Sequence, residues 1–180
     1  QPNKHFKCIS YTGNGSTQTI STVGFQPDLV WIKNRDATDS HQLFDSTRGV
    51  TKAIHADSTV AEAANDDTLT AFGSTGCSLG DDVVVNTNNE EYVAWCWKMA
   101  GGTTTSFTES GDNPGGTHQA NTTSGTSIVT YTGTGGAGTV SHGLGKIPRL
   151  ILIKNRDQTD NWAVYYLSLI HISEPTRQRV

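Results

Sequence analysis

The sequence is poor in charged residues and has no long apolar run. Asp, Glu, Lys and Arg make up 17% of its 180 residues, and 13 Lys and Arg stand against 17 Asp and Glu, which gives a formal net charge of −4. Phosphate binding needs clustered cations, so this composition argues against nucleic acid as a partner. No apolar run approaches the roughly 18 residues of a membrane-spanning helix, so no membrane span is expected. Because the chain starts at Gln1 with neither an initiator methionine nor a leader, we expect an internal fragment.

Cysteine is also scarce. The three cysteines, Cys8, Cys77 and Cys96, are an odd number, so at least one thiol stays unpaired. A disulfide framework is therefore not expected, and folding under reducing conditions fits better than secretion. Cys96, between two tryptophans, is expected to be a small buried apolar residue.

Thr, Ser and Gly, by contrast, make up a third of the chain, which favours short strands joined by turns over helical bundles. In the run 92–99, alternation places Val93, Trp95, Trp97 and Met99 on one face, which we expect to cover the core rather than to bind a ligand. Asn88–Asn89 suits a tight hairpin turn before this run. The strand-like runs are 6–11, 28–33, 82–86 and 92–99, and the segment 60–65 alone has a helix-like composition. The pattern predicts an all-β protein, an antiparallel β-sandwich or barrel.

An internal repeat defines the domain organisation. The block "YTGNG" at 11–15 returns as "YTGTG" 120 residues later, and "GFQPDLVWIKNRDATDS" at 24–40 returns as "GKIPRLILIKNRDQTDN" 121 residues later. This repeat implies a structural unit of about 120 residues, of which the second copy is truncated. We expect a first β domain at 1–100, a Gly/Thr/Ser-rich linker or long loop at 101–125, a truncated second β repeat at 126–166, and a tail at 167–180 that is not native. The tail resembles a translated sequencing adaptor.

Several short patterns suggest catalysis or metal binding but lack the required context. "GCSLG" at 76–80 fits a nucleophile elbow, yet a strand-forming run follows it instead of a helix. "GTGGAG" at 133–138 fits a phosphate-binding loop, yet no helix follows. The histidines show no metal-ligand spacing, and a Ca²⁺ site on Asp81, Asp82, Asn86 and Asn88 lacks the EF-hand spacing. We therefore predict no catalytic residue, cofactor or metal site.

The repeated block "KNRD" is the remaining candidate for ligand binding, because two cations, an amide and a carboxylate at a strand end could hydrogen-bond a sugar. A turn held by internal pairing is the favoured alternative. Trp162, Tyr165 and Tyr166, or Tyr11 on an exposed loop, could stack on a sugar ring. The candidate ligand-binding residues are Lys33, Asn34, Arg35, Asp36, Lys154, Asn155, Arg156, Asp157 and Trp162.

Taken together, the strings "YTGNGSTQTI", "GFQPDLVWIKNRD", "LFDSTRGV", "CSLGDDVVVN" and "YVAWCWKMAGG", followed by "SIVTYTGTG", "HGLGKIPRLILIKNRD" and "NWAVY", resemble a tandemly repeated, uncharacterised domain. That domain occurs in tail and other structural proteins of marine bacteriophages and their metagenomic relatives. The resemblance implies a jelly-roll or concanavalin-like (lectin-like) sandwich in a non-enzymatic virion protein, a tail or tail-fibre module. It implies other virion subunits as partners, a homo-oligomer, and a virion assembled in the host bacterial cytoplasm.

Two other functions stay open. The first is a lectin-like adhesion module that contacts a host surface glycan, and it is compatible with a place in the virion. The second is a polysaccharide depolymerase, which would need two acidic residues about 5 to 10 Å apart in a groove. The repeat keeps Asp36 and Asp39 as Asp157 and Asp160, but both pairs lie in the turn, so the enzyme is disfavoured.

Overall fold

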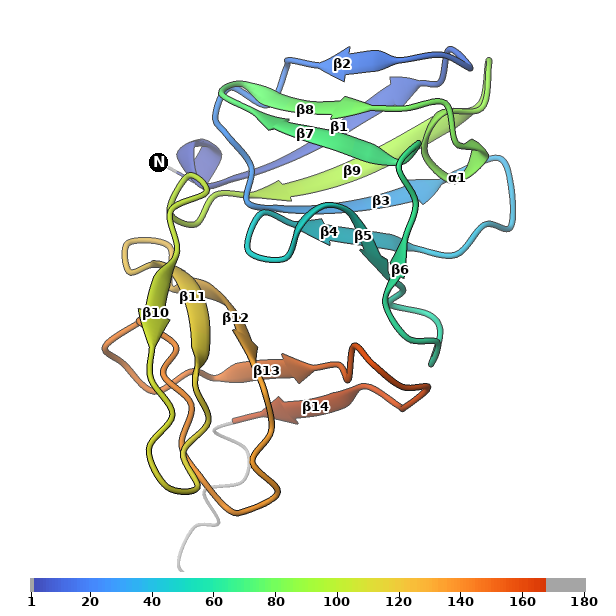
Figure 1. Cartoon of the computed structure of the whole chain (residues 1–180). Helices are drawn as coiled ribbons and strands as arrows, with labels where there is room; N and C mark the ends of the chain where they lie inside the picture. Colours follow the sequence, from blue (N-terminus) through green and yellow to red (C-terminus); the bar gives the residue numbers. More distant parts are fainter. Residues whose placement is uncertain (1, 168–180) are drawn as a thin grey trace, which may run out of the picture.

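The computed structural model describes residues 2–167 and is nearly all β, with antiparallel sheets consistent with a β-sandwich (Figure 1). A six-stranded sheet has the order β1-β9-β3-β4-β5-β6, and a three-stranded sheet, β2-β8-β7, covers one of its faces. The strands of the larger sheet are β1 (Phe6–Thr12), β9 (Glu91–Trp97), β3 (Leu29–Asn34), β4 (Gln42–Asp45), β5 (Gly49–Ile54) and β6 (Ala63–Ala64). Those of the smaller sheet are β2 (Gln18–Ile20), β8 (Gly76–Leu79) and β7 (Leu69–Gly73).

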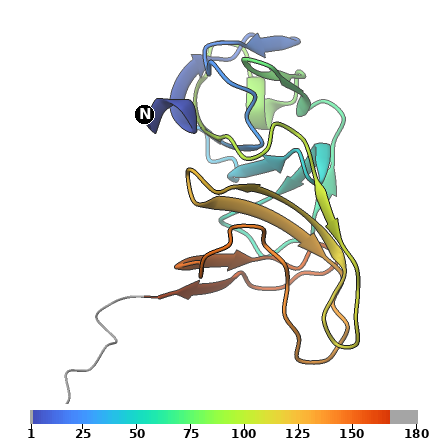
Figure 2. The ribbon, with the colours of Figure 1, turned by 90° about the vertical axis from the view of Figure 1, so that its left-hand side faces the viewer.

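The rest of the described chain lies below this sandwich in both views of the ribbon (Figure 2). It holds a three-stranded sheet, β10-β11-β12, and a two-stranded sheet, β13-β14. Their strands are β10 (Thr105–Phe107), β11 (Gly116–Asn121), β12 (Thr126–Tyr131), β13 (Leu150–Ile153) and β14 (Ala163–Tyr166), and two short helices, η1 (Pro2–Lys4) and α1 (Val83–Asn86), complete the elements. We call residues 2–100 the upper unit and residues 101–167 the lower unit.

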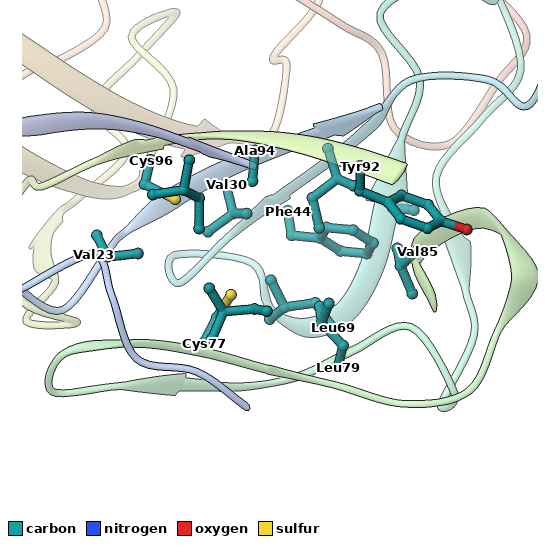
Figure 3. Packing of buried hydrophobic residues seen from close by; sticks show 14 of the residues in the cluster. Val23, Val30, Phe44, Leu69, Cys77, Leu79, Val85, Tyr92, Ala94 and Cys96 are labelled. Carbon is teal, nitrogen blue, oxygen red and sulfur yellow. The ribbon is translucent and has the colours of Figure 1, made fainter. Parts of the chain in front are cut away.

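The hydrophobic core fills the space between the two sheets of the upper unit (Figure 3). Val30 and Ile32 of β3, Phe44 of β4 and Leu69 and Leu79 of the smaller sheet are all fully buried. In β3, the burial of Val30 and Ile32 results from the period-2 alternation of the strand, because every second side chain points to the same face of the sheet. Each such side chain contributes about 1.5–3 kcal/mol by leaving water, so this cluster fixes the sandwich.

The expected core face of the 92–99 run is wrong for the residues of β9, and only Met99, beyond the strand, is buried as expected. In β9 the buried side chains are Tyr92, Ala94 and Cys96, whereas Trp95 and Trp97 point away from the smaller sheet and are only half-buried. The alternation was correct, but both faces of this strand are apolar, so the covering sheet decides which one is buried. The Tyr92 side chain can be buried because its hydroxyl accepts a hydrogen bond from the Thr87 amide and donates one to the Val83 carbonyl.

The expected strand at 82–86 is also wrong, because Val83–Asn86 forms α1. Asp82 caps the helix: its side chain accepts from the amide of Val84 at 2.9 Å. Val85 is then buried in the core, and this burial overrides the β preference of the valines. No hairpin connects 82–86 to β9, although Asn89 does adopt a positive φ of 65°. The segment 60–65, whose composition is helix-like but which is long enough for a turn or two at most, contains the strand β6.

The segment 101–125 differs from the expected linker or long loop, because it contains β10 and β11. Its threonines suit a strand surface, and Thr117 hydrogen-bonds Thr130 across the β11–β12 pair at 2.8 Å. Gln119 of β11 is nearly fully buried and donates to Ser46 of the upper unit. A segment without apolar runs can therefore still form ordered strands, as β10 and β11 do here. Of the expected tail, residues 168–180 lie outside the described residues.

The β13–β14 hairpin has the same register as β3–β4 when residue numbers are shifted by 121. Leu29 pairs with Asp45 in the upper unit, and Leu150 pairs with Tyr166 in the lower one. The turn that leads into each hairpin also contains a glycine with positive φ, Gly24 at 83° and Gly145 at 65°. The repeated sequence thus corresponds to the same local backbone geometry.

Candidate functional site

Four aromatic side chains lie on the face of the six-stranded sheet that is turned away from the core. Trp31 pairs with Trp95 across β3 and β9, and Phe6 pairs with Trp97 across β1 and β9. The ring centroids are 5.6 Å apart in the first pair and 4.9 Å in the second. We call these four residues the outer aromatic face. Phe6 is 38% exposed and the three tryptophans are half-buried, so the face offers rings with accessible apolar surface.

His41 fixes the orientation of Trp31 in this face. The Nε1–H group of Trp31 donates to Nδ1 of His41 at 2.7 Å, and the two rings meet edge to face. Because Nδ1 accepts, it carries no proton in this arrangement. The backbone around His41 is held from the next loop: its amide donates to Asp57, and its carbonyl lies 3.1 Å from Nδ1 of His55.

The repeated "KNRD" blocks form two turns with the same internal hydrogen bonds. In the first, Nζ of Lys33 donates to the carbonyls of Asn34 and Ala37, and Asn34 Oδ1 accepts from the amides of Asp36 and Ala37. Asn34 Nδ2 also donates to Asp39 at 2.7 Å. These bonds occupy the side-chain amide of Asn34 and two of the three N–H donors of Lys33, which leaves little of either group for a sugar.

In the second turn, Lys154 Nζ donates to the carbonyls of Asn155 and Gln158, at 2.8 and 3.3 Å. Asn155 Nδ2 donates to Asp160, and Asn155 Oδ1 accepts from the amide of Asp157. Of the two carboxylates that a depolymerase would need in each turn, one is thus bonded to the turn asparagine, namely Asp39 in the first turn and Asp160 in the second.

The remaining candidates of these two turns have different partners. Arg35 lies 3.7 Å from Glu91 in an exposed pair, and Asp36 accepts from the Glu91 amide. Arg156 instead reaches into the upper unit, and Trp162 Nε1 donates to the carbonyl of His55 at 2.8 Å. The second set of candidates therefore contributes to a contact between the two units and does not form a free binding site.

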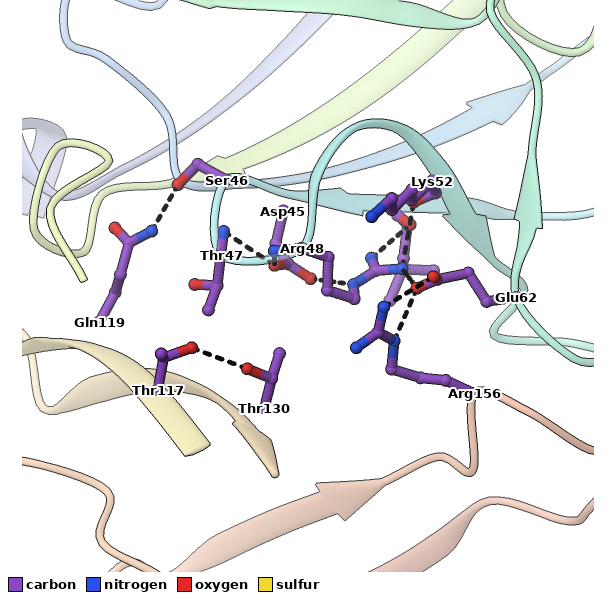
Figure 4. Close-up of polar contacts among 11 residues, drawn as sticks. Asp45, Ser46, Thr47, Arg48, Lys52, Glu62, Thr117, Gln119, Thr130 and Arg156 are labelled. Atoms are coloured by element: carbon purple, nitrogen blue, oxygen red, sulfur yellow. Dashed lines mark hydrogen bonds and ion pairs between the residues drawn. The ribbon is translucent and has the colours of Figure 1, made fainter. Parts of the chain in front are cut away.

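That contact is centred on a chain of charges (Figure 4). Arg156 donates two hydrogen bonds to Glu62, at 2.9 and 2.8 Å, and Glu62 also accepts from Arg48 at 2.8 Å. The Arg48 side chain is only 3% exposed and is also paired with Asp45. Burial by itself would raise the pKa of Glu62, but hydrogen bonds from Arg156 and Arg48 outweigh it and hold the pKa below its ordinary value. The hydrogen bond to Glu62 likewise raises the pKa of Arg156. Sequence reasoning missed this network, because its members are far apart in the chain.

The other motifs show no reactive geometry. Ser78 of "GCSLG" lies within β8, and its hydroxyl is 3.2 Å from that of Thr19. The helix that follows the strand, α1, has only four residues and begins at Val83, so Ser78 is not at a turn between a strand and a helix. Burial raises the pKa of the Cys77 thiol to about 12 and also raises that of Cys96, so both thiols stay protonated near neutral pH. Tyr11, expected on an exposed loop, lies in β1, stacks on Tyr92 at 5.1 Å and donates to the Val85 carbonyl. Its proposed role as a sugar platform is wrong.

Two of the four calcium candidates have structural roles: Asp82 caps α1, and Asn86 bonds to Asn14 and Gly80. Within residues 2–167, no group of three or more His, Cys, Asp or Glu side chains is placed to hold a metal ion. In the same range, no helix has the length and apolar character needed to cross a bilayer.

The fold and these contacts define the class: an antiparallel, all-β protein whose two units are joined by the Arg156–Glu62 ion pair and whose main sheet carries an aromatic outer face. The chain belongs to a family of domains of unknown function (DUF7483), which it matches over residues 1–177. That match covers both units and most of the suspected tail. Comparison with curated proteins and with solved structures returns no match.

Proposed function

We propose that this protein is a non-enzymatic structural module of a bacteriophage virion, in a tail or tail fibre, built from β units in series. The resemblance of its repeated motifs to phage structural proteins suggests the virion, and the contact between units supports the series. The observation that carries the proposal is Glu62, which accepts from Arg48 of its own unit and from Arg156 of the next. Such a contact holds successive units in a fixed relative orientation, as a fibre or tail component requires.

The same proposal includes a tandem repeat with a truncated second copy and a sandwich of concanavalin or jelly-roll type. The shared register of β3–β4 and β13–β14 supports the repeat, as do the two equivalent "KNRD" turns. A six-stranded sheet facing a three-stranded one supports the sandwich type. Other virion subunits and further copies of the chain are the proposed partners, and assembly takes place in the host cytoplasm.

Mass spectrometry of gradient-purified particles tests the virion assignment. Particles are prepared from a phage that encodes this sequence, and peptides from both units are quantified against the major capsid protein. We expect the chain in the particle at a fixed copy number. Recovery of its peptides only in the soluble lysate fraction, with none in particles, would refute the assignment.

A second candidate function is glycan binding, which the outer aromatic face favours. Trp31 and Trp95 lie in register and His41 fixes one of the two rings, so the face is preorganised for stacking on a sugar ring. The test is a glycan array with the full chain, its Trp31→Ala variant, and Tyr131→Ala as a control that alters an exposed aromatic residue away from the outer aromatic face. Binding that Trp31→Ala loses and Tyr131→Ala keeps would support this site. Equal binding by all three proteins would exclude it.

A further inference from the structure

The β13–β14 hairpin exposes apolar side chains on both of its faces. Leu150 lies opposite Tyr166, and Leu152 lies opposite Val164, so these four side chains form one continuous apolar face. Six side chains of the two strands are between 42% and 64% exposed: Leu150, Leu152, Ile153, Val164, Tyr165 and Tyr166.

The exposed apolar area of this hairpin is large. Side chains of these types, when about half exposed, leave on the order of 100 Å² each in contact with water, or about 600 Å² for the six. That is the upper end of the contiguous apolar patches that monomers expose, and patches of this size mark interaction sites. Contributed once by each of two copies, the area reaches about 1,200 Å², which is the lower limit for a specific interface between proteins. A second hairpin of the same kind is therefore a sufficient partner, and the resulting dimer should be weak and reversible.

The open edge of β14 lies on the side of the hairpin that is turned away from the upper unit. β13 lies between β14 and the upper unit in both views of the ribbon (Figure 1, Figure 2). Within residues 2–167, β14 pairs only with β13. The Leu167 amide donates to the Arg149 carbonyl, so alternation directs the N–H and C=O groups of Val164 and Tyr166 to the open edge.

This edge lacks the features that keep other strand edges of the molecule from pairing. β6 has only two residues, β1 carries Lys7, and the ladder of β7 with β8 contains a register shift. Ala163–Tyr166 has no charged residue and no proline, and its ladder with β13 is regular. A regular, uncharged apolar edge is a template for a further strand.

We propose that the open edge of β14 pairs with β14 of a second copy of this chain, antiparallel and about a two-fold axis at Tyr165. Val164 of each copy then forms a hydrogen-bonded pair with Tyr166 of the other, and the two Tyr165 side chains lie opposite each other. The edge is self-complementary, because both copies present the same donors and acceptors. The two hairpins together form one sheet in the order β13-β14-β14-β13. The inference rests on the part of the proposed function in which further copies of the chain are partners, and not on the virion assignment.

Sedimentation velocity of the full chain from about 1 to 200 μM tests the proposal. We expect a reversible equilibrium between monomer and dimer that shifts toward the dimer as the concentration rises. Hydrogen exchange of the Val164 and Tyr166 amides should slow at least threefold between the lowest and the highest concentration. Exchange of the Tyr165 amide, which is already bonded toward β13, should not change.

Charge substitutions at Tyr165 separate this contact from a loss of the fold. Tyr165→Lys and Tyr165→Glu each place like charges opposite one another across the two-fold axis, so each should dimerise at least tenfold more weakly than the parent chain. An equimolar mixture of the two variants places opposite charges there and should dimerise at least tenfold more tightly than either variant alone. The matched control is Tyr131→Lys, which changes an exposed tyrosine of β12 and should dimerise within about threefold of the parent chain.

Three results would overturn the proposal: a monomer at every concentration, protection of β12 amides in place of Val164 and Tyr166, or a mixture of the two Tyr165 variants that dimerises no more tightly than either alone. None of these results bears on whether the chain is found in virions, which mass spectrometry of the particles decides.

Discussion

Glu62→Gln should destabilise the protein by about 2–3 kcal/mol, although the substitution removes a charge with almost no change in volume. Arg48 is 3% exposed, and it loses one of its charged partners while keeping Asp45 and the carbonyls of Leu43 and Lys52. A hydrogen bond between charged groups in such a place contributes about 1.5–3 kcal/mol. Arg156 is 39% exposed and can be rehydrated, so its lost pair adds only about 0–1 kcal/mol.

Urea unfolding at pH 7 measures this loss, with Glu109→Gln as the matched control, since Glu109 is exposed. The control should lie within about 0.5 kcal/mol of the parent chain. If Glu62→Gln also falls within that range, then the network does not couple the units and the reasoning is refuted.

The pH dependence gives an independent check on the same residue. The pKa of Glu62 lies below its ordinary value in the folded protein. The charged form therefore stabilises the fold, and this contribution is complete above the pKa of the unfolded chain, about 4.3, and is lost as the pH falls through the lower folded value. The difference between parent and Glu62→Gln should be constant from about pH 5.5 to 7 and shrink below about pH 4. A difference that grows on acidification would contradict this assignment.

Three further outcomes are expected from the upper unit. Phe44→Ala should lower the free energy of unfolding by about 3–5 kcal/mol, measured by urea titration, because the ring is fully buried between the sheets. Asp82→Ala should cost about 1 kcal/mol in the same assay through loss of the α1 cap, with the exposed Asp66→Ala as its control. In the native protein at pH 8, a thiol reagent should label the exposed Cys8 rapidly and the buried Cys77 and Cys96 only after denaturant is added, and rapid labelling of all three would contradict the packing.

The strands whose flanking residues are turn formers could be predicted from the sequence. The runs 6–11 and 28–33 are strands within one residue of the expected bounds, as β1 and β3. Local alternation and the bordering Gly, Asn and Asp sufficed for these. α1 could not be predicted in this way, because its valines favour a strand and the outcome depends on the Asp82 cap and on a core that Val85 fills.

The outer aromatic face shows a second limit of what the sequence alone can predict. In β9 alternation separated Trp95 and Trp97 from Tyr92, Ala94 and Cys96, but both sets are apolar. The choice between them depends on the covering sheet, which accommodates Tyr92 because α1 supplies partners for its hydroxyl. One strand seen alone does not contain that information, so alternation by itself cannot tell an exposed aromatic face from a core face.

The two "KNRD" turns separate what a repeated motif can predict from what it cannot. Lys33 and Lys154 each donate to carbonyls one and four residues ahead, and Asn34 and Asn155 each donate to an aspartate five residues ahead. Contacts this short depend on the local sequence, so identical blocks give identical turns. The arginines reach beyond the turn, and there the surroundings differ: Arg35 meets Glu91 of its own unit at the surface, whereas Arg156 meets Glu62 across the contact between units. The same residue in the same turn is thus peripheral in one copy and structural in the other, and only the arrangement of the units distinguishes the two roles.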